Sequence, residues 1–346
     1  MNYSTFSDRL LEWYEVNKRA LPWRNTRDPY VIWVSEIILQ QTRVDQGMAY
    51  FNRFIARFPN ISRLAGASEE EVLSLWQGLG YYSRARNMHS AANEMQNGTG
   101  SFPETYSDIL ALKGVGPYTA AAIASFAFDL PHAVIDGNVN RVITRLFGLD
   151  APVNSSEVKK EIERRTNELF NPKQAALHNQ AMMEFGALHC TVNSPKCHTC
   201  PFSQECQAYL MGKTHEIPMK GKKMQKTARF FNYMVFRCGD SIILNKRTEN
   251  DIWKNLYDFP SITAKAKNEE VSSLFEEEEG AYQANLIGKS DWVKHLLSHQ
   301  DIYARFWEYS IDKPELILRE NWKLVRIDQL GSYPFPKLIE NYLGAS

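Results

Sequence analysis

Four cysteines stand close together in the second half of the helical part of this chain and restrict how it can fold. Cys190, Cys197, Cys200 and Cys206 follow the pattern C-x6-C-x2-C-x5-C within 17 residues. Four thiolates that converge on one centre suit zinc or a 4Fe-4S cluster. Zinc modules typically use two short Cys-x2-Cys pairs, and only one pair is short here, so the spacing favours iron–sulfur. The alternative, four unrelated buried cysteines, is disfavoured because chance rarely places four in so short a segment.

The chain before and around these cysteines has the spacing of successive helices. Apolar residues recur every three or four positions in Phe6-Leu10-Trp13-Tyr14 and in Val72-Leu75-Trp76, and glycine-rich turns separate such stretches. We therefore predict an all-α domain over residues 1–215, with the cysteine loop at 190–206 as its last module.

A different pattern follows. Between Lys213 and Arg229 there are six basic residues, one acidic residue and little apolar material, which predicts a linker over 216–229. Short alternating runs at 231–236 and 241–244 are then separated by Gly-Asp, which indicates a hairpin. We predict an α+β domain over 230–346, with Cys238 as a small core residue of a strand and the acidic run Glu276 to Glu279 in a solvated loop.

The charge balance must be divided between these domains. The 346 residues carry 40 Lys plus Arg and 40 Asp plus Glu, which removes the simplest argument for a nucleic-acid partner. However, residues 1–229 hold 26 basic and 22 acidic residues, and residues 230–346 hold 14 and 18. The neutral chain is thus a slightly basic part followed by a slightly acidic one, and a nucleic-acid partner stays open.

The sequence gives no sign of export or of a membrane partner. The amino-terminal residues lack a continuous apolar segment, and the longest apolar stretch, 120–128, is far shorter than the roughly 20 residues that a membrane span needs. Clustered cysteines without a disulfide framework suit a reducing compartment. We expect a cytoplasmic protein.

A glycine hairpin joins two predicted helices at residues 112–120. Gly114 and Gly116 flank Val115 in Lys113-Gly-Val-Gly-Pro, and this turn lets the backbone approach a ligand closely. Amide groups at the start of the second helix then form a phosphate site without side-chain charge. An isolated Gly-x-Gly is also typical of a plain tight turn between packed helices.

Two carboxylates stand in unusual positions. Asp136 follows an apolar pair at a predicted helix start, where it could be an N-cap, a catalytic group or both, and a capping aspartate that accepts amide bonds should stay ionised. Glu36 is the only charge in an apolar helix that Asp28-Pro29 opens. Burial should raise its pKa and let it hold a proton near neutral pH, unless it is paired with a buried arginine such as Arg24 or Arg43.

Six motifs occur in a fixed order along residues 1 to about 215. They are LPWR (21–24), WVSEIILQQT (33–42), WQGLGYYSRARN (76–87), LKGVGPYTA (112–120), VIDGNV (134–139) and the four-cysteine loop. Together they resemble the adenine DNA glycosylase family of the helix-hairpin-helix superfamily. The resemblance implies a helical catalytic domain with a 4Fe-4S cluster, and an enzyme that flips adenine out of double-stranded DNA containing A:8-oxoguanine or A:G and leaves an abasic site.

The same resemblance gives roles to the two carboxylates. Glu36 would protonate adenine N7, and Asp136 would stabilise the positively charged sugar, by its charge or by a transient covalent bond. Bifunctional relatives place a lysine after the hairpin to form a Schiff base, whereas this chain has Tyr118. We therefore expect a monofunctional hydrolase. Separately, we expect the protein to act as a monomer.

Further residues are carried over from the motifs as DNA contacts. The adenine pocket would include Trp23, Arg24, Leu39 and Gln180; the group beside the lesion would include Gln41, Thr42, Leu79, Gly80 and Tyr81; and the backbone contacts would include Lys113, Gly114, Val115, Gly116 and Asn138.

The second domain resembles the carboxy-terminal, Nudix-like domain of the same family. Ser298 and His299 would lie at the 8-oxoguanine edge, although the family segment begins with an aromatic residue where this chain has Leu297. The full Nudix box is absent, so no pyrophosphatase activity is expected. Two alternatives remain: an endonuclease III-like glycosylase and lyase, and a non-catalytic DNA-binding protein in which Glu36 is structural.

Overall fold

The computed structural model describes residues 3–221, 225–264 and 284–344. The chain forms two compact units: unit 1 comprises Met1–Gly66 and Asn87–Lys222, and unit 2 comprises Ala67–Arg86 and Lys223–Ser346. The predicted acidic loop Glu276 to Glu279 lies outside the described residues.

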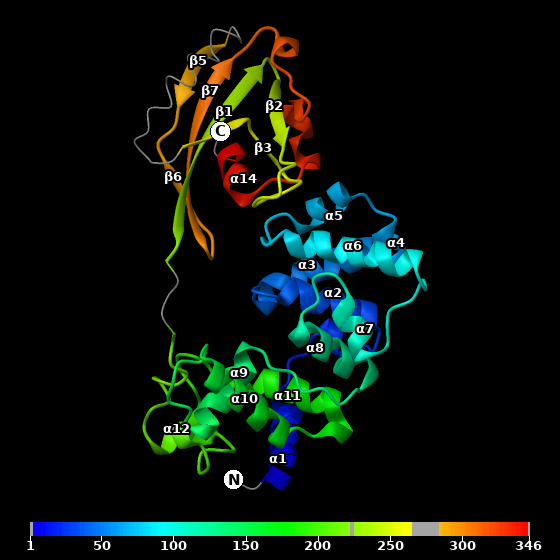
Figure 1. Ribbon diagram of the computed structural model, residues 1–346, viewed down its shortest axis with the longest axis vertical. Helices are drawn as coiled ribbons and strands as arrows, with labels where there is room; N and C mark the ends of the chain where they lie inside the picture. Colours follow the sequence, from blue (N-terminus) through cyan, green and yellow to red (C-terminus); the bar gives the residue numbers. More distant parts are fainter. Residues whose placement is uncertain (1–2, 222–224, 265–283, 345–346) are drawn as a thin grey trace. The chain divides into compact units, whose positions relative to one another are not determined.

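Unit 1 is helical, as predicted (Figure 1). Its α-helices are α1 (Tyr3–Asn17), α2 (Pro29–Leu39), α3 (Val44–Arg57), α4 (Ile61–Ala65), α7 (Tyr106–Ala111), α8 (Pro117–Phe128), α9 (Gly137–Phe147), α10 (Ser156–Leu169), α11 (Ala175–Leu188) and α12 (Gln207–Leu210). Helix α6 (Ser83–Asn97) crosses from unit 2 into unit 1.

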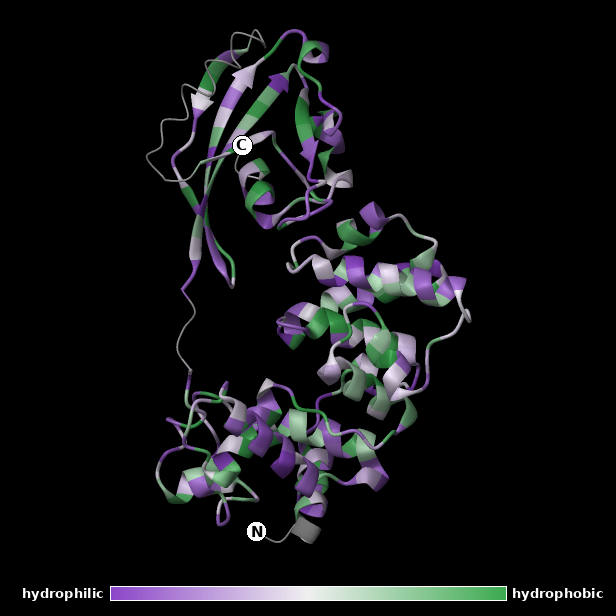
Figure 2. Ribbon diagram, in the orientation of Figure 1, coloured by the Kyte–Doolittle hydropathy of each residue, from purple (hydrophilic) through white to green (hydrophobic). Residues whose placement is uncertain are grey.

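Buried apolar stripes hold unit 1 together. Phe6 and Leu10 of α1 pack with Ile143 of α9 and Phe185 of α11 in one core. Figure 2 shows hydrophobic and hydrophilic residues along the same helices, as expected where one face is buried and the other is solvated. Helix α2 differs, because eight of its eleven residues are buried, including Glu36. This matches the prediction of a buried helix.

The glycine hairpin connects α7 to α8. Gly114 has φ 81°, and a Cβ there would lie 2.7 Å from Cβ of Asn87, so both conformation and space require glycine. Gly116 caps α8 and has no neighbouring atom within 4 Å of a built Cβ. The backbone at the start of α8 is therefore open to a ligand.

Unit 2 is an α+β unit built on one sheet. In its described part the strands are β1 (Thr227–Cys238), β2 (Ser241–Lys246), β3 (Tyr257–Asp258), β4 (Ser261–Ala264), β5 (Asn285–Lys289), β6 (Val293–Leu296), β7 (Gln300–Ser310) and β8 (Trp322–Arg326). The order is β3-β2-β1-β7-β5, with β4 paired to β1, β6 to β7 and β8 to β2. The predicted hairpin is confirmed, since Cys238 pairs with Ser241 across Gly239-Asp240.

The two long central strands of this sheet, β1 and β7, run parallel and are buried by different groups on their two faces. Helix α14 (Lys337–Leu343) covers one face, where Leu338 and Ile339 pack on Phe231 and Phe306 (Figure 1). On the other face, Met234 and Phe236 form a second cluster, against which Cys238 packs as predicted.

The predicted linker is shorter than expected at both ends. Ile217 is buried and its carbonyl accepts from Arg145 Nε at 2.9 Å, so residues near the start of 216–229 pack on unit 1. Strand β1 already begins at Thr227, inside the expected linker. The basic composition of 216–229 did not reveal either boundary of the linker, because a segment with many polar side chains can still pair its backbone in a strand or pack against a domain.

Unit 2 also contains residues 67–86, which the sequence placed in the helical domain. This segment holds α5 (Glu69–Trp76) and the turn before α6. Tyr82 donates its hydroxyl proton to the Phe335 carbonyl at 3.0 Å, and Arg86 Nη1 donates to the Lys254 carbonyl at 2.9 Å. These contacts join residues far apart in sequence, which no local pattern reveals.

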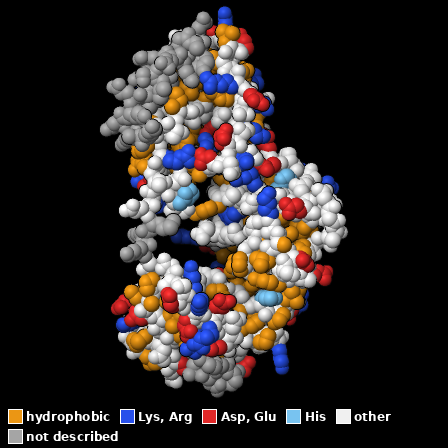
Figure 3. Space-filling model, viewed as in Figure 1, with side chains coloured by type: hydrophobic (Ala, Val, Ile, Leu, Met, Phe, Trp, Pro, Cys, Tyr) orange, Lys and Arg blue, Asp and Glu red, His pale blue; other side chains and the backbone are white. Residues whose placement is uncertain are grey.

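The surface carries mixed charge. On the face shown in Figure 3, Lys and Arg side chains stand among Asp and Glu side chains. Within the described residues, no helix has the length and apolar content that a membrane crossing requires.

Candidate active site

A cavity of about 940 Å³ in unit 1 is lined by both predicted catalytic carboxylates. Glu36 comes from α2, Tyr118 from the first turn of α8, and Asp136 from the start of α9. Seven further predicted contacts line the same cavity: Trp23, Arg24, Leu39, Gln41, Thr42, Asn138 and Gln180. Unit 1 thus brings together residues from all parts of its sequence.

Glu36 is only 6% exposed and receives a hydrogen bond from the Tyr118 hydroxyl at 2.7 Å. Burial raises its pKa to about 7, and the charge of Asp136 adds to this, while the Tyr118 hydrogen bond and Arg24 act in the opposite direction. A carboxyl with this pKa is partly protonated at neutral pH and can act as a general acid. The alternative of an ion pair is not borne out for Arg24, since the guanidinium of Arg24 is bonded to Glu184.

Asp136 caps α9, as predicted. Its Oδ1 accepts from the Val139 amide at 2.7 Å, and its Oδ2 accepts from Asn138 Nδ2 at 2.7 Å. Burial nevertheless raises the pKa of Asp136, and the hydrogen bonds from Val139 and Asn138 oppose that rise. We expected the capping hydrogen bonds to keep Asp136 ionised. That expectation left out the cost of burying the charge, which acts in the opposite direction.

Glu184 is a residue that the sequence reasoning missed. It is 1% exposed and accepts hydrogen bonds from the Arg19 backbone amide at 2.9 Å, from the Arg19 guanidinium at 2.9 and 2.7 Å, and from the Arg24 guanidinium at 3.0 and 2.8 Å. Burial alone would raise its pKa, but these hydrogen bonds lower it to about 2. Glu184 is the only charged residue in α11. A single charge in an apolar helix was the signal that identified Glu36, and the same signal could have identified Glu184.

Arg141 links the Asp136 end of the cavity to the cysteine loop. Its Nη2 donates to Asn138 Oδ1 at 2.8 Å, and its Nε donates to the Cys190 carbonyl at 2.8 Å. The pKa of Arg141 is lowered by burial. The orientation of Asn138, and through it of Asp136, therefore depends on the loop that begins at Cys190.

The four cysteines line one small cavity of about 30 Å³ and form no disulfide. Arg145 Nη1 donates to Cys190 Sγ at 3.4 Å, and the Phe202 amide donates to Cys200 Sγ at 3.4 Å. Burial, with the other thiols nearby, raises the pKa of Cys200 to about 12. Across the described residues, no group of three or more His, Cys, Asp or Glu side chains is arranged to hold a single metal ion.

The remaining predicted contacts of unit 1 belong to the hairpin. Lys113 is exposed and donates to Ser90 Oγ at 3.1 Å, while Gly114, Val115 and Gly116 form the turn. None of these four lines the carboxylate cavity. They are placed beside α8, where a backbone phosphate contact was expected.

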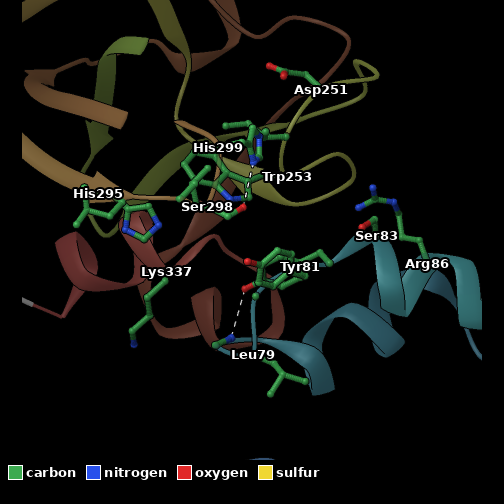
Figure 4. A pocket seen from close by; sticks show the side chains of 16 residues that line it. Leu79, Tyr81, Ser83, Arg86, Asp251, Trp253, His295, Ser298, His299 and Lys337 are labelled. Atoms are coloured by element: carbon green, nitrogen blue, oxygen red, sulfur yellow. Dashed lines mark hydrogen bonds between the residues drawn. The ribbon is translucent and has the colours of Figure 1, made fainter. Parts of the chain in front are cut away.

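A second cavity, of about 470 Å³, lies in unit 2 (Figure 4). It brings together Leu79, Gly80 and Tyr81 with Ser298 and His299, as the predicted lesion contacts require. Tyr81 is 48% exposed and has φ 49°, next to Gly80 with φ 77°. The Tyr81 ring is thus exposed at the cavity and is not part of the core.

Comparison with known proteins gives the family. The profile of the HhH-GPD superfamily base excision DNA repair proteins matches residues 34–172, and a NUDIX domain profile matches residues 232–345. Adenine DNA glycosylase of Buchnera aphidicola subsp. Baizongia pistaciae is 35% identical over 97% of this chain and 95% of its own length. The chain belongs to the adenine DNA glycosylase family.

Some other members of the family are longer than this chain, so the match covers a smaller share of their length. The adenine DNA glycosylases of Arabidopsis thaliana and Homo sapiens are 36% and 40% identical over 76% and 59% of this chain, and over 48% and 39% of their own lengths. These matches confirm the expected family and its α plus α+β architecture. As a member of this family the chain is a DNA glycosylase, an enzyme of base excision DNA repair, which excludes the non-catalytic alternative.

Solved structures agree on the helical fold. That of a thermostable thymine-DNA glycosylase is 29% identical and has a TM-score of 0.56, over 60% of this chain and 97% of the other. That of an endonuclease III–DNA complex is 21% identical with a TM-score of 0.53, over 61% and 98%. The second likeness concerns the fold alone.

Proposed function

We propose that this protein removes adenine from A:8-oxoguanine and A:G mispairs in double-stranded DNA, hydrolyses the N-glycosidic bond, and leaves an abasic site. One observation supports this most: a buried glutamic acid with a pKa of about 7, Glu36, lines the same cavity as the helix-capping Asp136. A buried carboxyl that can hold a proton, next to a second carboxyl that accepts hydrogen bonds from a helix start, suits the cleavage of a glycosidic bond.

The reaction begins with proton transfer. Glu36 gives its proton to adenine N7, so that the bond between N9 and C1′ breaks and the base leaves as neutral adenine. Its hydrogen bond from Tyr118 keeps the carboxyl in place and stabilises the carboxylate that results. Trp23, Arg24, Leu39 and Gln180 surround the flipped base in this scheme, and Arg24 is held by Glu184.

The sugar cation that remains is stabilised by Asp136, through its charge or through a transient bond to C1′. Water then adds to C1′ and gives its proton to the Glu36 carboxylate, which restores the acid, and the abasic sugar is released. The position after the hairpin is Tyr118, which has no amine to form a Schiff base with C1′. The product is therefore an intact strand with an abasic site, and a borohydride trap should capture no protein–DNA adduct.

Four cysteines on one cavity suit a 4Fe-4S cluster, which would be held by Cys190, Cys197, Cys200 and Cys206. The cysteine spacing, with a single short Cys-x2-Cys pair, favours a cluster over a single zinc. The purified protein should be brown and contain iron and acid-labile sulfide. Cys197→Ser should bleach the visible absorption, Cys238→Ser should not, and a colourless zinc-loaded protein would contradict the assignment.

The unit 2 cavity would read the base opposite adenine. Tyr81, with Leu79 and Gly80, would enter the base stack beside the lesion, and Ser298 and His299 would contact its edge. Substituting Ser298 and His299 by Ala should reduce the preference for A:8-oxoguanine over A:G more than it slows base release. His215→Ala, at an exposed site in unit 1, serves as the control.

The decisive experiment is single-turnover adenine release by Glu36→Gln on an A:8-oxoguanine duplex. Loss of the acid should reduce the rate by roughly 10²- to 10⁴-fold, while duplex binding is kept. Glu163→Gln, at an exposed position of α10, should behave as the parent. A Glu36→Gln variant with the parent's rate would show that the mechanism is wrong.

A further inference from the structure

The unit 2 cavity has walls that the proposed lesion contacts do not account for. Trp253 and His295 line it together with Tyr81, Ser298 and His299, and Figure 4 shows these side chains grouped around one space. They come from three separate segments: the turn before α6, the loop between β2 and β3, and β6 with the residues after it.

The backbone of Trp253 is strained. Its φ is 61°, in the left-handed region that bulky residues seldom adopt, and Tyr81 on another wall has φ 49°. Such conformations persist only where the surroundings enforce them, and they gather at binding and active sites. Two aromatic residues in this conformation on one cavity therefore indicate that the aromatic walls are set for a ligand.

The loop of Trp253 is held from behind by Arg247. The guanidinium donates to the Ile252 carbonyl at 3.1 Å and to the fully buried Asp258 at 2.8 Å, and its centre lies 6.0 Å from the centroid of the Trp253 ring. The carbonyl of Arg247 accepts from the Asn255 amide at 2.6 Å. These bonds fix the loop on both sides of Trp253 and leave its indole half-buried at the cavity wall.

His295 meets the indole from β6. The two ring centroids are 6.0 Å apart at an interplanar angle of 62°. Burial lowers the pKa of His295, so that the ring is neutral at physiological pH, with one nitrogen as donor and one as acceptor. None of the hydrogen bonds found among the described residues involves the His295 ring or the Trp253 Nε1–H group.

These groups match the edge of an oxidised guanine. Oxidation at C8 adds a carbonyl oxygen there and converts N7 from an acceptor into an N–H donor. An indole N–H can donate to the new oxygen, and a neutral imidazole can accept from N7–H. Unmodified guanine offers N7 as an acceptor and has no oxygen at C8, so it would leave one of these groups unpaired.

We propose that Trp253 and His295 are specificity-determining residues that contact the base opposite the excised adenine and favour 8-oxoguanine over guanine. The proposal rests on the function proposed above and adds two contacts to it. Trp253 supplies a stacking surface as well as a donor, and Arg247 acts as the positioning residue of its loop.

The test compares single-turnover rates and dissociation constants for A:8-oxoguanine and A:G duplexes. Trp253→Leu should lower the preference for 8-oxoguanine roughly tenfold, and His295→Ala should lower it with little change on A:G. Trp253→Phe keeps the stacking surface but loses the donor, so it should bind both duplexes well and discriminate less. The matched control is Trp292→Leu, a half-buried tryptophan of unit 2 that packs on Phe230 and Arg305 and does not line the cavity.

The outcomes separate this proposal from the proposed function. If the parent prefers A:8-oxoguanine and the Trp253 and His295 variants keep that preference, the proposal is wrong and the function stands. If the parent releases no adenine from either duplex, both fail. A thermal unfolding curve is recorded for each variant, and if Trp253→Leu does not fold, Trp253→Phe and His295→Ala decide the question.

Discussion

The two cavities differ in where their buried carboxyl groups lie. In unit 1, Glu36 lines the cavity, burial raises its pKa to about 7, and the Tyr118 hydroxyl is its hydrogen-bond partner. In unit 2, burial raises the pKa of Asp258 to about 6, yet Asp258 is bonded to Arg247 and is not among the residues that line the cavity. A perturbed pKa alone would mark both as functional.

The difference teaches that reactivity needs access as well as burial. Glu36 lines its cavity and can transfer a proton to a group bound there, whereas Asp258, through Arg247, fixes the loop of Trp253 behind the second cavity. Both cavities include charged side chains, but the walls of the unit 2 cavity consist mostly of rings, hydroxyls and aliphatic side chains. Substitutions should therefore affect chemistry in the first cavity and selectivity in the second.

Glu184→Gln should have the largest effect on stability and would test how far the first cavity depends on buried charge. The substitution leaves Arg19 and Arg24 without their common anion, which should lower the free energy of unfolding by about 3 kcal/mol. Urea unfolding at neutral pH measures this.

The matched control for Glu184 is Glu161→Gln. The pKa of Glu161 is also lowered to about 2, by Arg164 and Arg165, but its carboxylate is solvated, so the loss should stay below about 1 kcal/mol. The contribution of Glu184 to the free energy of unfolding should also depend on pH, with a definite sign. Because the folded-state pKa of Glu184 lies below its ordinary 4.5, its contribution is complete above pH 4.5 and is lost as the pH falls toward 2. Equal losses in the two variants would contradict the role of burial.

The sequence was a good guide to unit 1 for a physical reason. Glu36 is a single charge in an apolar helix, and Asp136 follows an apolar pair at a helix start, so each carries its signal within a few neighbouring residues. Glu184 has the same local signal in α11 and was overlooked. The cysteine spacing likewise predicted convergence, and the four cysteines line one cavity.

The second cavity could be predicted only in part. Tyr81, Ser298 and His299 were found through family motifs. His295 lies three residues before Ser298 but was given no role, and Trp253 lies in a segment that matched no motif. Their positions depend on the pairing of β6 with β7 and on the bonds of Arg247 to residues elsewhere in unit 2. Hydrophobic periodicity in the sequence predicts which face of a helix or strand is buried. It does not predict which loops, distant in sequence, come into contact.

Tyr118→Phe would sharpen the account of the first cavity through its pH profile. The hydroxyl bond stabilises the Glu36 carboxylate, so its removal should raise the pKa of Glu36 above about 7. Since the protonated acid is the active form, the single-turnover rate should fall with rising pH, and the midpoint of that fall should move up by roughly one pH unit in the variant.

Tyr30→Phe is the control for this shift. Tyr30 lies in the same helix as Glu36 and donates its hydroxyl proton to the Phe58 carbonyl at 2.7 Å, away from the cavity. The pH midpoint of adenine release by the Tyr30→Phe variant should match that of the parent protein. A Tyr118→Phe midpoint that stays in place, or that moves to lower pH, would show that another group carries the proton.

Tyr82→Phe should have the smallest effect and tests whether residues 67–86 belong with the second cavity. The change removes one hydrogen bond, from the Tyr82 hydroxyl to the Phe335 carbonyl, and takes away the acceptor of the Gly78 amide. Unfolding of unit 2 should become easier by about 1 kcal/mol, and amide hydrogen exchange should rise in the turn at 78–82. Because Tyr81 is presented by that turn, selectivity for the opposite base should weaken while the pH midpoint of adenine release stays at the parent's value. A variant that changes the pH midpoint but not the selectivity would place this segment with the chemistry of the first cavity instead.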